Sequence, residues 1–151
     1  MGTHYKGSPE EIQALDAYIK LLRATSSVTT RITKHKSAGD LKGSQFGTLE
    51  MLYHLGPLNQ NAIGTKLLIS RSNVVAVIDK LEEKALVRRE RSREDRRCIF
   101  VHLTDKGQEV IASLLPAHVA AITKEMSCLT GEEQAELGRL CRKLGLNQSE
   151  S

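Results

Sequence analysis

The stretch LISRSNVVAVIDKLEEKALVRRERSREDRRCIFVHLTDKG, which spans residues 68–107, decides the fold class. Ser70 is a favoured N-cap residue, and Val74, Ile78 and Leu81 follow it at helical spacing, which predicts a helix of about fourteen residues. Beyond Ala85 the period changes, and from residue 98 to 103 successive side chains alternate between two faces. We therefore expect two short strands joined by an arginine-rich loop.

Two shorter helices are expected before this stretch. The segment from Phe46 to Leu55 has helical periodicity and is stopped by Gly56 and Pro57, and Asn59 can cap a further short helix. That second helix and the helix after residue 70 meet at a tight turn. A helix-turn-helix followed directly by a β-hairpin is a winged helix.

Long amphipathic helices are expected at both ends of the chain. One begins at Pro9, with Ser8 as its N-cap, and two more begin after Thr104, with Pro116 inside, and after Thr130. Their apolar faces favour a dimer, although a hydrophobic core within one chain would also explain them. The expected fold is mainly α with a small β-hairpin wing, in a single domain of residues 1–151. Its winged helix-turn-helix covers about residues 44–104, flanked by dimerisation helices at about 9–37 and 104–146.

Composition narrows the functional class. A chain of 151 residues with 40% hydrophobic and 26% charged residues fits one globular domain. It has no apolar run long enough for a membrane span and no signal-peptide core, so we expect a cytoplasmic protein that does not bind membranes. Three widely spaced cysteines favour neither a disulfide scaffold nor a zinc site. Without a phosphate-binding loop or a nucleophile motif, we expect no cofactor, no metal and no enzyme activity.

Positive charge is concentrated between residues 88 and 97. Six arginines lie there against three acidic residues, so 6 − 3 = +3 of the chain's net charge of +4 falls in this segment. An arginine-rich segment is often only a solvated loop. Here it joins the two strands of the expected hairpin, directly after a helix of the size that fits the major groove of DNA.

The quoted stretch resembles the MarR family of bacterial transcription regulators. The likeness lies in VIDKLEEKALV, in Asp95 and Arg97 of the wing, and in the pattern V-x-L-T-x-K-G from Val101 to Gly107, and it extends over nearly the whole chain. The phrases FGTLEMLYHLGPL and IGTKLLIS are similar to a branch that responds to quinones or phenolic compounds. The resemblance implies a homodimer that binds double-stranded DNA at a palindromic operator. It also implies repression that a small aromatic or quinone-like effector, or an oxidant, relieves.

The first turn of the recognition helix supplies the candidate base contacts. Residues at this end of such a helix reach base edges in the major groove, and here they are Ser70, Arg71, Ser72 and Asn73. Asn73 can bond adenine and Arg71 guanine or a phosphate, whereas Ser70 can also serve only as the cap. Where the family commonly has a polar Thr and a basic residue, this chain has Val75 and Ala76. We therefore expect specificity to depend on DNA shape as well.

The wing supplies the candidate minor-groove contacts, because a narrow minor groove attracts arginine. The candidates are Arg93, Arg96 and Arg97. By resemblance Arg97 inserts into the groove, and Asp95 holds the tip arginines through a bidentate ion pair. Lys66 and Lys80 are candidates for phosphate contacts or plain surface lysines.

An effector pocket is expected between the first helix, the helix of Phe46 and the helix after Thr104. Its candidate ligands are Tyr53, His54 and His118, with His35 less favoured, although a lone histidine is more often structural. The rival hypothesis is a thiol sensor at Cys98, beside Arg96 and Arg97. Cys128 and Cys141 are expected to be small buried hydrophobic residues. A winged helix that binds an acidic protein instead of DNA is the alternative from another functional class.

Overall fold

The computed structural model describes residues 2–35 and 37–147, and the chain divides into two compact units, residues 1–36 and 37–151. The first unit contains one long helix, α1 (Pro9–Lys34). Ser8 caps it as expected, because its Oγ accepts a hydrogen bond from the backbone N–H of Glu11, and Pro9 occupies the first turn. None of the residues of α1 is buried, so its apolar side chains remain available to another surface.

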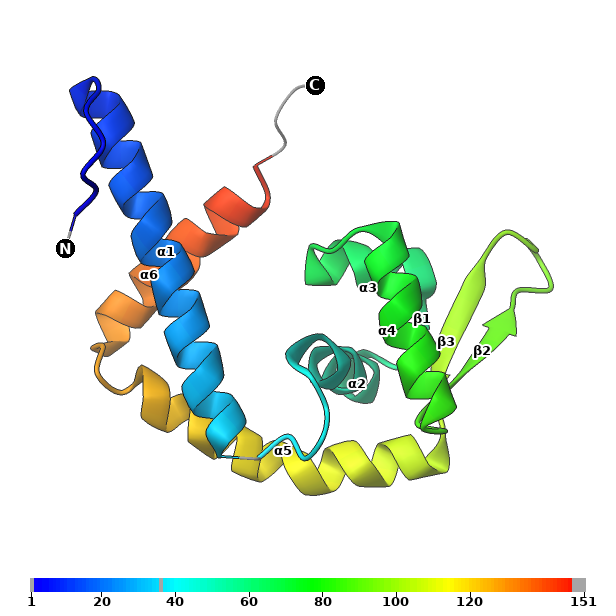
Figure 1. Cartoon of the computed structure of the whole chain (residues 1–151). Helices are drawn as coiled ribbons and strands as arrows, with labels where there is room; N and C mark the ends of the chain where they lie inside the picture. Colours follow the sequence, from blue (N-terminus) through cyan, green and yellow to red (C-terminus); the bar gives the residue numbers. More distant parts are fainter. Residues whose placement is uncertain (1, 36, 148–151) are drawn as a thin grey trace. The chain divides into compact units, whose positions relative to one another are not determined.

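The second unit contains the winged helix-turn-helix. In chain order its elements are α2 (Gly43–Leu55), β1 (Leu58–Asn59), α3 (Gln60–Leu67), α4 (Arg71–Glu83), β2 (Val87–Arg91), β3 (Ile99–Leu103), α5 (Asp105–Met126) and α6 (Gly131–Gly145). Figure 1 shows β2 and β3 as a hairpin that projects beyond α4. The predicted fold class, mainly α with a small β wing, is confirmed.

The sheet has three strands, whereas the sequence predicted only a two-stranded hairpin. The order is β1-β3-β2, and both pairings are antiparallel, with Leu58 opposite Val101 and Arg89 opposite Val101 on the other side. The strand that the prediction missed, β1, has two residues, which is too short for an alternating pattern to be visible. Because β1 and β2 both pair with β3, β3 is the central strand and β1 and β2 are the two edge strands.

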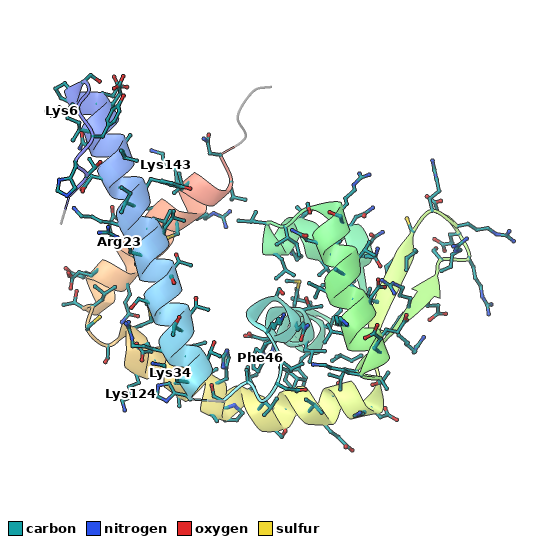
Figure 2. All side chains as sticks on the ribbon, viewed as in Figure 1. Lys6, Arg23, Lys34, Phe46, Lys124 and Lys143 are labelled. Carbon is teal, nitrogen blue, oxygen red and sulfur yellow. The ribbon has the colours of Figure 1, made fainter. Side chains whose placement is uncertain are left out.

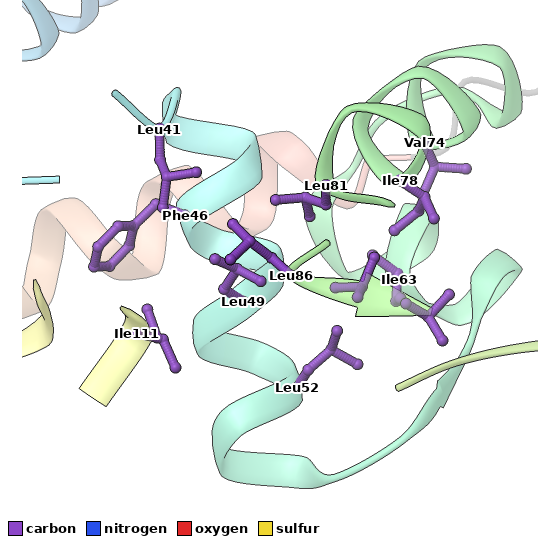
Figure 3. Close-up of a cluster of buried hydrophobic side chains, with 12 residues drawn as sticks. Leu41, Phe46, Leu49, Leu52, Ile63, Val74, Ile78, Leu81, Leu86 and Ile111 are labelled. Carbon is purple, nitrogen blue, oxygen red and sulfur yellow. The ribbon is translucent and has the colours of Figure 1, made fainter. Parts of the chain in front are cut away.

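A single cluster of buried side chains holds these elements together (Figure 3). Helix α2 lies at its centre and contributes Phe46, Leu49 and Leu52, which are at most 3% exposed. The other members come from α3, α4, the turn after α4, the strands and α5: Ile63, Val74, Ile78, Leu81, Leu86, Val87, Val101 and Ile111, with Leu41 from the loop before α2. The inward face of α4 is therefore fixed by the core, and its other face is left for solvent or a ligand.

The helix ends follow the sequence signals. Asn59, Ser70, Thr104 and Thr130 each accept a hydrogen bond from the first turn of the helix that they cap, and Thr130 forms a capping box with Glu133. Gly56 ends α2 with a φ of 80°, in the left-handed region that glycine adopts at little cost. In the part of the chain that the structure describes, no helix is long and apolar enough to cross a bilayer.

Gly107 is required for the close approach between α5 and the segment that leads into the wing. This segment consists of Ala85 and Leu86, directly before β2. The Oγ1 of Thr104 donates a hydrogen bond to the carbonyl oxygen of Ala85 at 2.6 Å, and the N–H of Thr104 donates to that of Leu86 at 3.1 Å. A Cβ atom at position 107 would lie 2.0 Å from the same Leu86 carbonyl oxygen. The glycine of the V-x-L-T-x-K-G pattern therefore has a packing reason.

We predict that Gly107→Ala lowers the free energy of unfolding by about 3 kcal/mol, because the clash is with backbone that cannot rotate away. Urea unfolding at one fixed protein concentration measures this. Gly43→Ala is the matched control, since a Cβ there would meet nothing within 4 Å. Equal stability of the two variants would contradict the packing argument.

Candidate DNA-binding surface

The first turn of α4 presents polar side chains to solvent. Ser70 caps the helix, because its Oγ accepts a hydrogen bond from the N–H of Asn73 at 3.2 Å, and it also lies 3.1 Å from the hydroxyl of Ser72. Arg71, Ser72 and Asn73 are exposed, whereas Val74 is 1% exposed and anchors the turn in the core. No acidic residue lies in this turn, so its backbone N–H groups and Arg71 form a positive surface.

The next turn of the exposed face is apolar, as the sequence indicated. Val75 is 39% exposed and Ala76 is exposed beside it. Further along the same helix, Lys80 lies 3.4 Å from Glu83, so its charge is partly compensated. Lys66 is exposed in the last turn of α3. Helices α3 and α4 therefore offer few cations that could contact DNA phosphates.

The tip of the wing is organised around Asp95. Its Oδ1 accepts hydrogen bonds from the backbone N–H and the Nε of Arg97, at 3.0 and 3.1 Å, and its Oδ2 lies 3.4 Å from the donor Nη2. These hydrogen bonds from Arg97 hold the pKa of the Asp95 carboxyl below its usual range. Ser92 closes the loop, since its Oγ accepts from the N–H groups of Glu94 and Asp95 at 3.3 Å. The bidentate pair that the sequence predicted is present for Arg97.

Three further arginines at this end of the hairpin have side chains without a direct partner, although the charge of Arg93 still acts on Glu90. Within residues 2–35 and 37–147, the side chains of Arg91, Arg93 and Arg96 make no hydrogen bond or ion pair, and all three are exposed. The expectation that Asp95 holds all of the tip arginines is therefore wrong in part. Among the described arginines, Asp95 binds Arg97 alone. Figure 2 shows the long side chains of the hairpin loop projecting away from the body of the unit.

The two remaining arginines of the segment are used within the protein. Arg88 pairs with Glu90 at 2.9 Å, and Glu90 also lies 3.3 Å from His102 on the neighbouring strand. The hydrogen bond from Arg88 lowers the pKa of the Glu90 carboxyl. Arg89 pairs with acidic side chains of α4. The sequence counted these two arginines toward the exposed charge, and nothing in their local pattern distinguishes them from the free ones.

The expected effector residues fall into two groups within the second unit. Tyr53 and His54 are neighbours on α2, with ring centroids 5.2 Å apart, and His54 lies 3.9 Å from Glu50. His118 of α5 packs against Phe46, with ring centroids 4.0 Å apart, and lies 3.0 Å from the hydroxyl of Ser37. Phe46 is labelled in Figure 2. His35 belongs to the first unit, where its backbone N–H caps α1.

The cysteines differ from the expectation. Cys128 and Cys141 are exposed, not buried, and α6 has no buried residue. Cys98 is half-buried at the base of the wing loop, and its Sγ lies 3.8 Å from the Oδ2 of Asp95. The described residues contain no group of three His, Cys, Asp or Glu side chains that could hold a metal ion.

The helix-turn-helix, the cation-bearing wing and the exposed first turn of α4 define a winged helix-turn-helix regulator. Comparison with known proteins agrees with this class. The model of the MarR family matches residues 41–99. The HTH-type transcriptional regulator MhqR of Bacillus subtilis is 35% identical over 135 residues, which are 89% of this chain and 93% of MhqR. The chain belongs to the MarR family of transcriptional regulators.

Two solved structures are similar over most of their length. Sco3205, a MarR family transcriptional regulator of Streptomyces coelicolor in complex with DNA, is 26% identical, with a TM-score of 0.82 over 98% of this chain and 95% of Sco3205. A MepR-like protein complexed with pseudoligands is 29% identical, with a TM-score of 0.69 over 91% of this chain and 93% of that one. MhqR and Sco3205 are both named as transcriptional regulators.

We predict that His118 makes folding stability depend on pH. Burial lowers the pKa of His118, and the charge of Glu50 only partly opposes this shift. The unfolded chain then binds a proton more readily than the folded one, so stability is full above the ordinary value of about 6.5 and declines as pH falls through the lowered value.

Thermal unfolding between pH 8 and about 5 tests this dependence. His118→Gln should flatten the acid side of the curve, whereas His4→Gln, at an exposed position near the N-terminus, serves as the control. An unchanged acid decline in the His118 variant would show that other groups cause it.

Proposed function

We propose that this protein is a dimeric, sequence-specific DNA-binding transcriptional regulator that acts in the cytoplasm as a repressor and is released by a small aromatic or phenolic effector. The observation that carries the proposal is the wing tip, where Arg93, Arg96 and Arg97 are exposed next to a helix whose first turn is polar and cationic. The DNA complex of Sco3205 supports the choice of partner.

Each lobe would contact DNA at two points. The first turn of α4 enters the major groove, where Asn73 and Arg71 reach base edges and Ser70 and Ser72 reach bases or phosphates. The wing follows the adjacent minor groove, where Arg97 inserts in the orientation that Asp95 gives it, while Arg93 and Arg96 lie near phosphates. Lys66 and Lys80 add backbone contacts.

A second copy of the chain would complete the DNA-binding surface, because one winged helix-turn-helix makes too few contacts with DNA for tight specific binding. Helices α1 and α6 have no buried residues among those described, and α6 exposes Leu137, Leu140 and Leu144 by 40% or more. We assign dimerisation to residues 9–37 and 104–146 and DNA reading to residues 44–104. A two-fold dimer binds a palindrome with half-sites about one helical turn apart.

The effector would act on the side of α2 and α5 away from DNA. Tyr53, His54 and His118 offer aromatic and polar groups there, and the α2 phrase of the sequence resembles the branch that responds to quinones or phenols. The MepR-like structure holds pseudoligands in a chain of the same fold. An effector shifts the equilibrium only if it binds the DNA-competent and DNA-incompetent arrangements with different affinity.

Selection of bound duplexes from a random pool tests this function. We expect a palindromic site, and an affinity for random duplex that falls linearly on a plot of log affinity against log salt, because many phosphates are contacted. Addition of phenols and quinones should release the selected duplex. Failure to bind duplex at low salt would favour the alternative, a winged helix that binds an acidic protein.

We predict that Arg97→Ala weakens binding to the selected duplex at least about tenfold, because minor-groove insertion is lost. Fluorescence anisotropy measures the affinity, and size-exclusion chromatography with light scattering should show an unchanged dimer. Lys6→Ala removes the same charge at an exposed position outside the residues assigned to dimerisation and DNA reading, and is the control for net charge. Unchanged affinity of the Arg97 variant would remove the wing from the account.

A further inference from the structure

Arg89 of β2 is the most extensively bonded side chain of the wing. Its Nε donates to Gln60 Oε1 at 2.9 Å, its Nη1 donates to Glu82 Oε1 at 3.1 Å, and its Nη2 lies 2.7 Å from Asp79 Oδ1. Nη2 also donates to the carbonyl oxygen of Val75 at 3.4 Å. One guanidinium therefore connects β2 with α3 and with two turns of α4.

The backbone of β2 takes part in the same network. The Oε2 of Glu82 accepts a hydrogen bond from the N–H of Arg89 at 3.2 Å, on the edge of β2 that faces away from β3. Glu82 therefore bonds both the main chain and the side chain of Arg89. This arrangement fixes the position of the strand along α4, in addition to its orientation.

The surroundings of Arg89 distinguish it from a phosphate-binding residue. Its side chain is 22% exposed, whereas that of Arg97 is 91% exposed. Both carboxylates that contact it belong to the exposed side of α4, at 52% and 44% exposure for Asp79 and Glu82. A DNA phosphate that approached Arg89 would be repelled by these two carboxylates, and nearly all of the donors of the guanidinium are already used.

We propose that Arg89 is a positioning residue for DNA recognition, which does not contact DNA but fixes the separation between the first turn of α4 and the wing tip. The proposal rests on the proposed function. Two contact points that are rigidly linked bind a matching site more tightly than either alone, and the gain is lost when their geometry does not match the site. Arg89 would therefore contribute to the preference for the operator over other DNA.

The test compares affinity for the selected duplex with affinity for a random duplex, in Arg89→Met, Arg89→Lys and the wild type. We expect the preference for the selected duplex to fall about tenfold in both variants, because lysine keeps the charge but cannot reproduce the planar fork. The slope of log affinity against log salt on random duplex should stay unchanged. Arg88→Met is the matched control, since Arg88 pairs with Glu90 on its own strand and, among the residues that the structure describes, with no side chain of α4; the preference should therefore persist.

A phosphate contact predicts a different outcome. Loss of such a contact weakens all duplexes alike and reduces the salt slope by about one, and lysine would restore most of the binding. Either restoration by Arg89→Lys or a uniform loss in Arg89→Met would overturn the proposal. Circular dichroism and the dimer mass establish that each variant is folded.

Asp79→Asn gives a second test that keeps Arg89 in place. Removal of a negative charge from the exposed side of α4 should raise affinity for random duplex by simple electrostatics. Because it also turns the shortest contact of Arg89 from an ion pair into a neutral hydrogen bond, which is weaker, we expect the preference for the selected duplex to fall. If Asp79→Asn keeps the full preference for the selected duplex over random duplex, positioning by Arg89 is contradicted. This test holds even if Arg89→Met does not fold. If the wild type itself selects no duplex, the proposed function fails, and with it the basis of this proposal.

Discussion

The packing of β2 against α4 is the constraint on which the rest of this surface depends. The apolar side chains of α4 and the strands place the two elements in one core, and the guanidinium of Arg89 then fixes their separation through Gln60, Asp79 and Glu82. In the proposed function, the exposed first turn of α4 and the cationic wing tip contact the same DNA site at once. They can do so only if the distance between them is fixed. Val87 attaches the hairpin to the core at the start of β2, and Arg89 adds contacts with α4 two residues further along the strand.

Most of the fold could be predicted from the sequence, because local signals and the global arrangement agree. Ser8, Asn59, Ser70, Thr104 and Thr130 all cap helices where the pattern places them, and the alternation from residue 98 to 103 gives the hairpin. Strand β1 was missed because its two residues pair only through tertiary contact with β3. The exposure of Cys128 and Cys141 was missed for a related reason: an apolar stripe on a helix indicates that it can be covered, but not whether its own chain covers it.

The sequence predicted where the candidate DNA-binding site lies, but not the partner of each of its side chains. Six arginines between residues 88 and 97 marked the wing, and the resemblance to the MarR family implied the pair of Asp95 with Arg97. The sequence did not predict which of the six arginines pair within the protein and which are exposed to solvent. Arg88 and Arg89 are adjacent, yet side chains of a strand point to opposite faces, so one meets Glu90 on its own strand and the other meets α4. Partners from a different element, such as Gln60, lie 29 positions away in the chain and leave no local signal.

Footprinting of the selected duplex tests the central claim most directly, because it reads the spacing of the two contact points on DNA. Methylation interference reports the major groove, and hydroxyl-radical cleavage reports the minor groove. The account predicts, in each half-site, a major-groove contact at a constant distance from a minor-groove protection, with the pair repeated by two-fold symmetry about one helical turn away. Major-groove contacts without the neighbouring minor-groove protection, or protections at variable spacing, would contradict it.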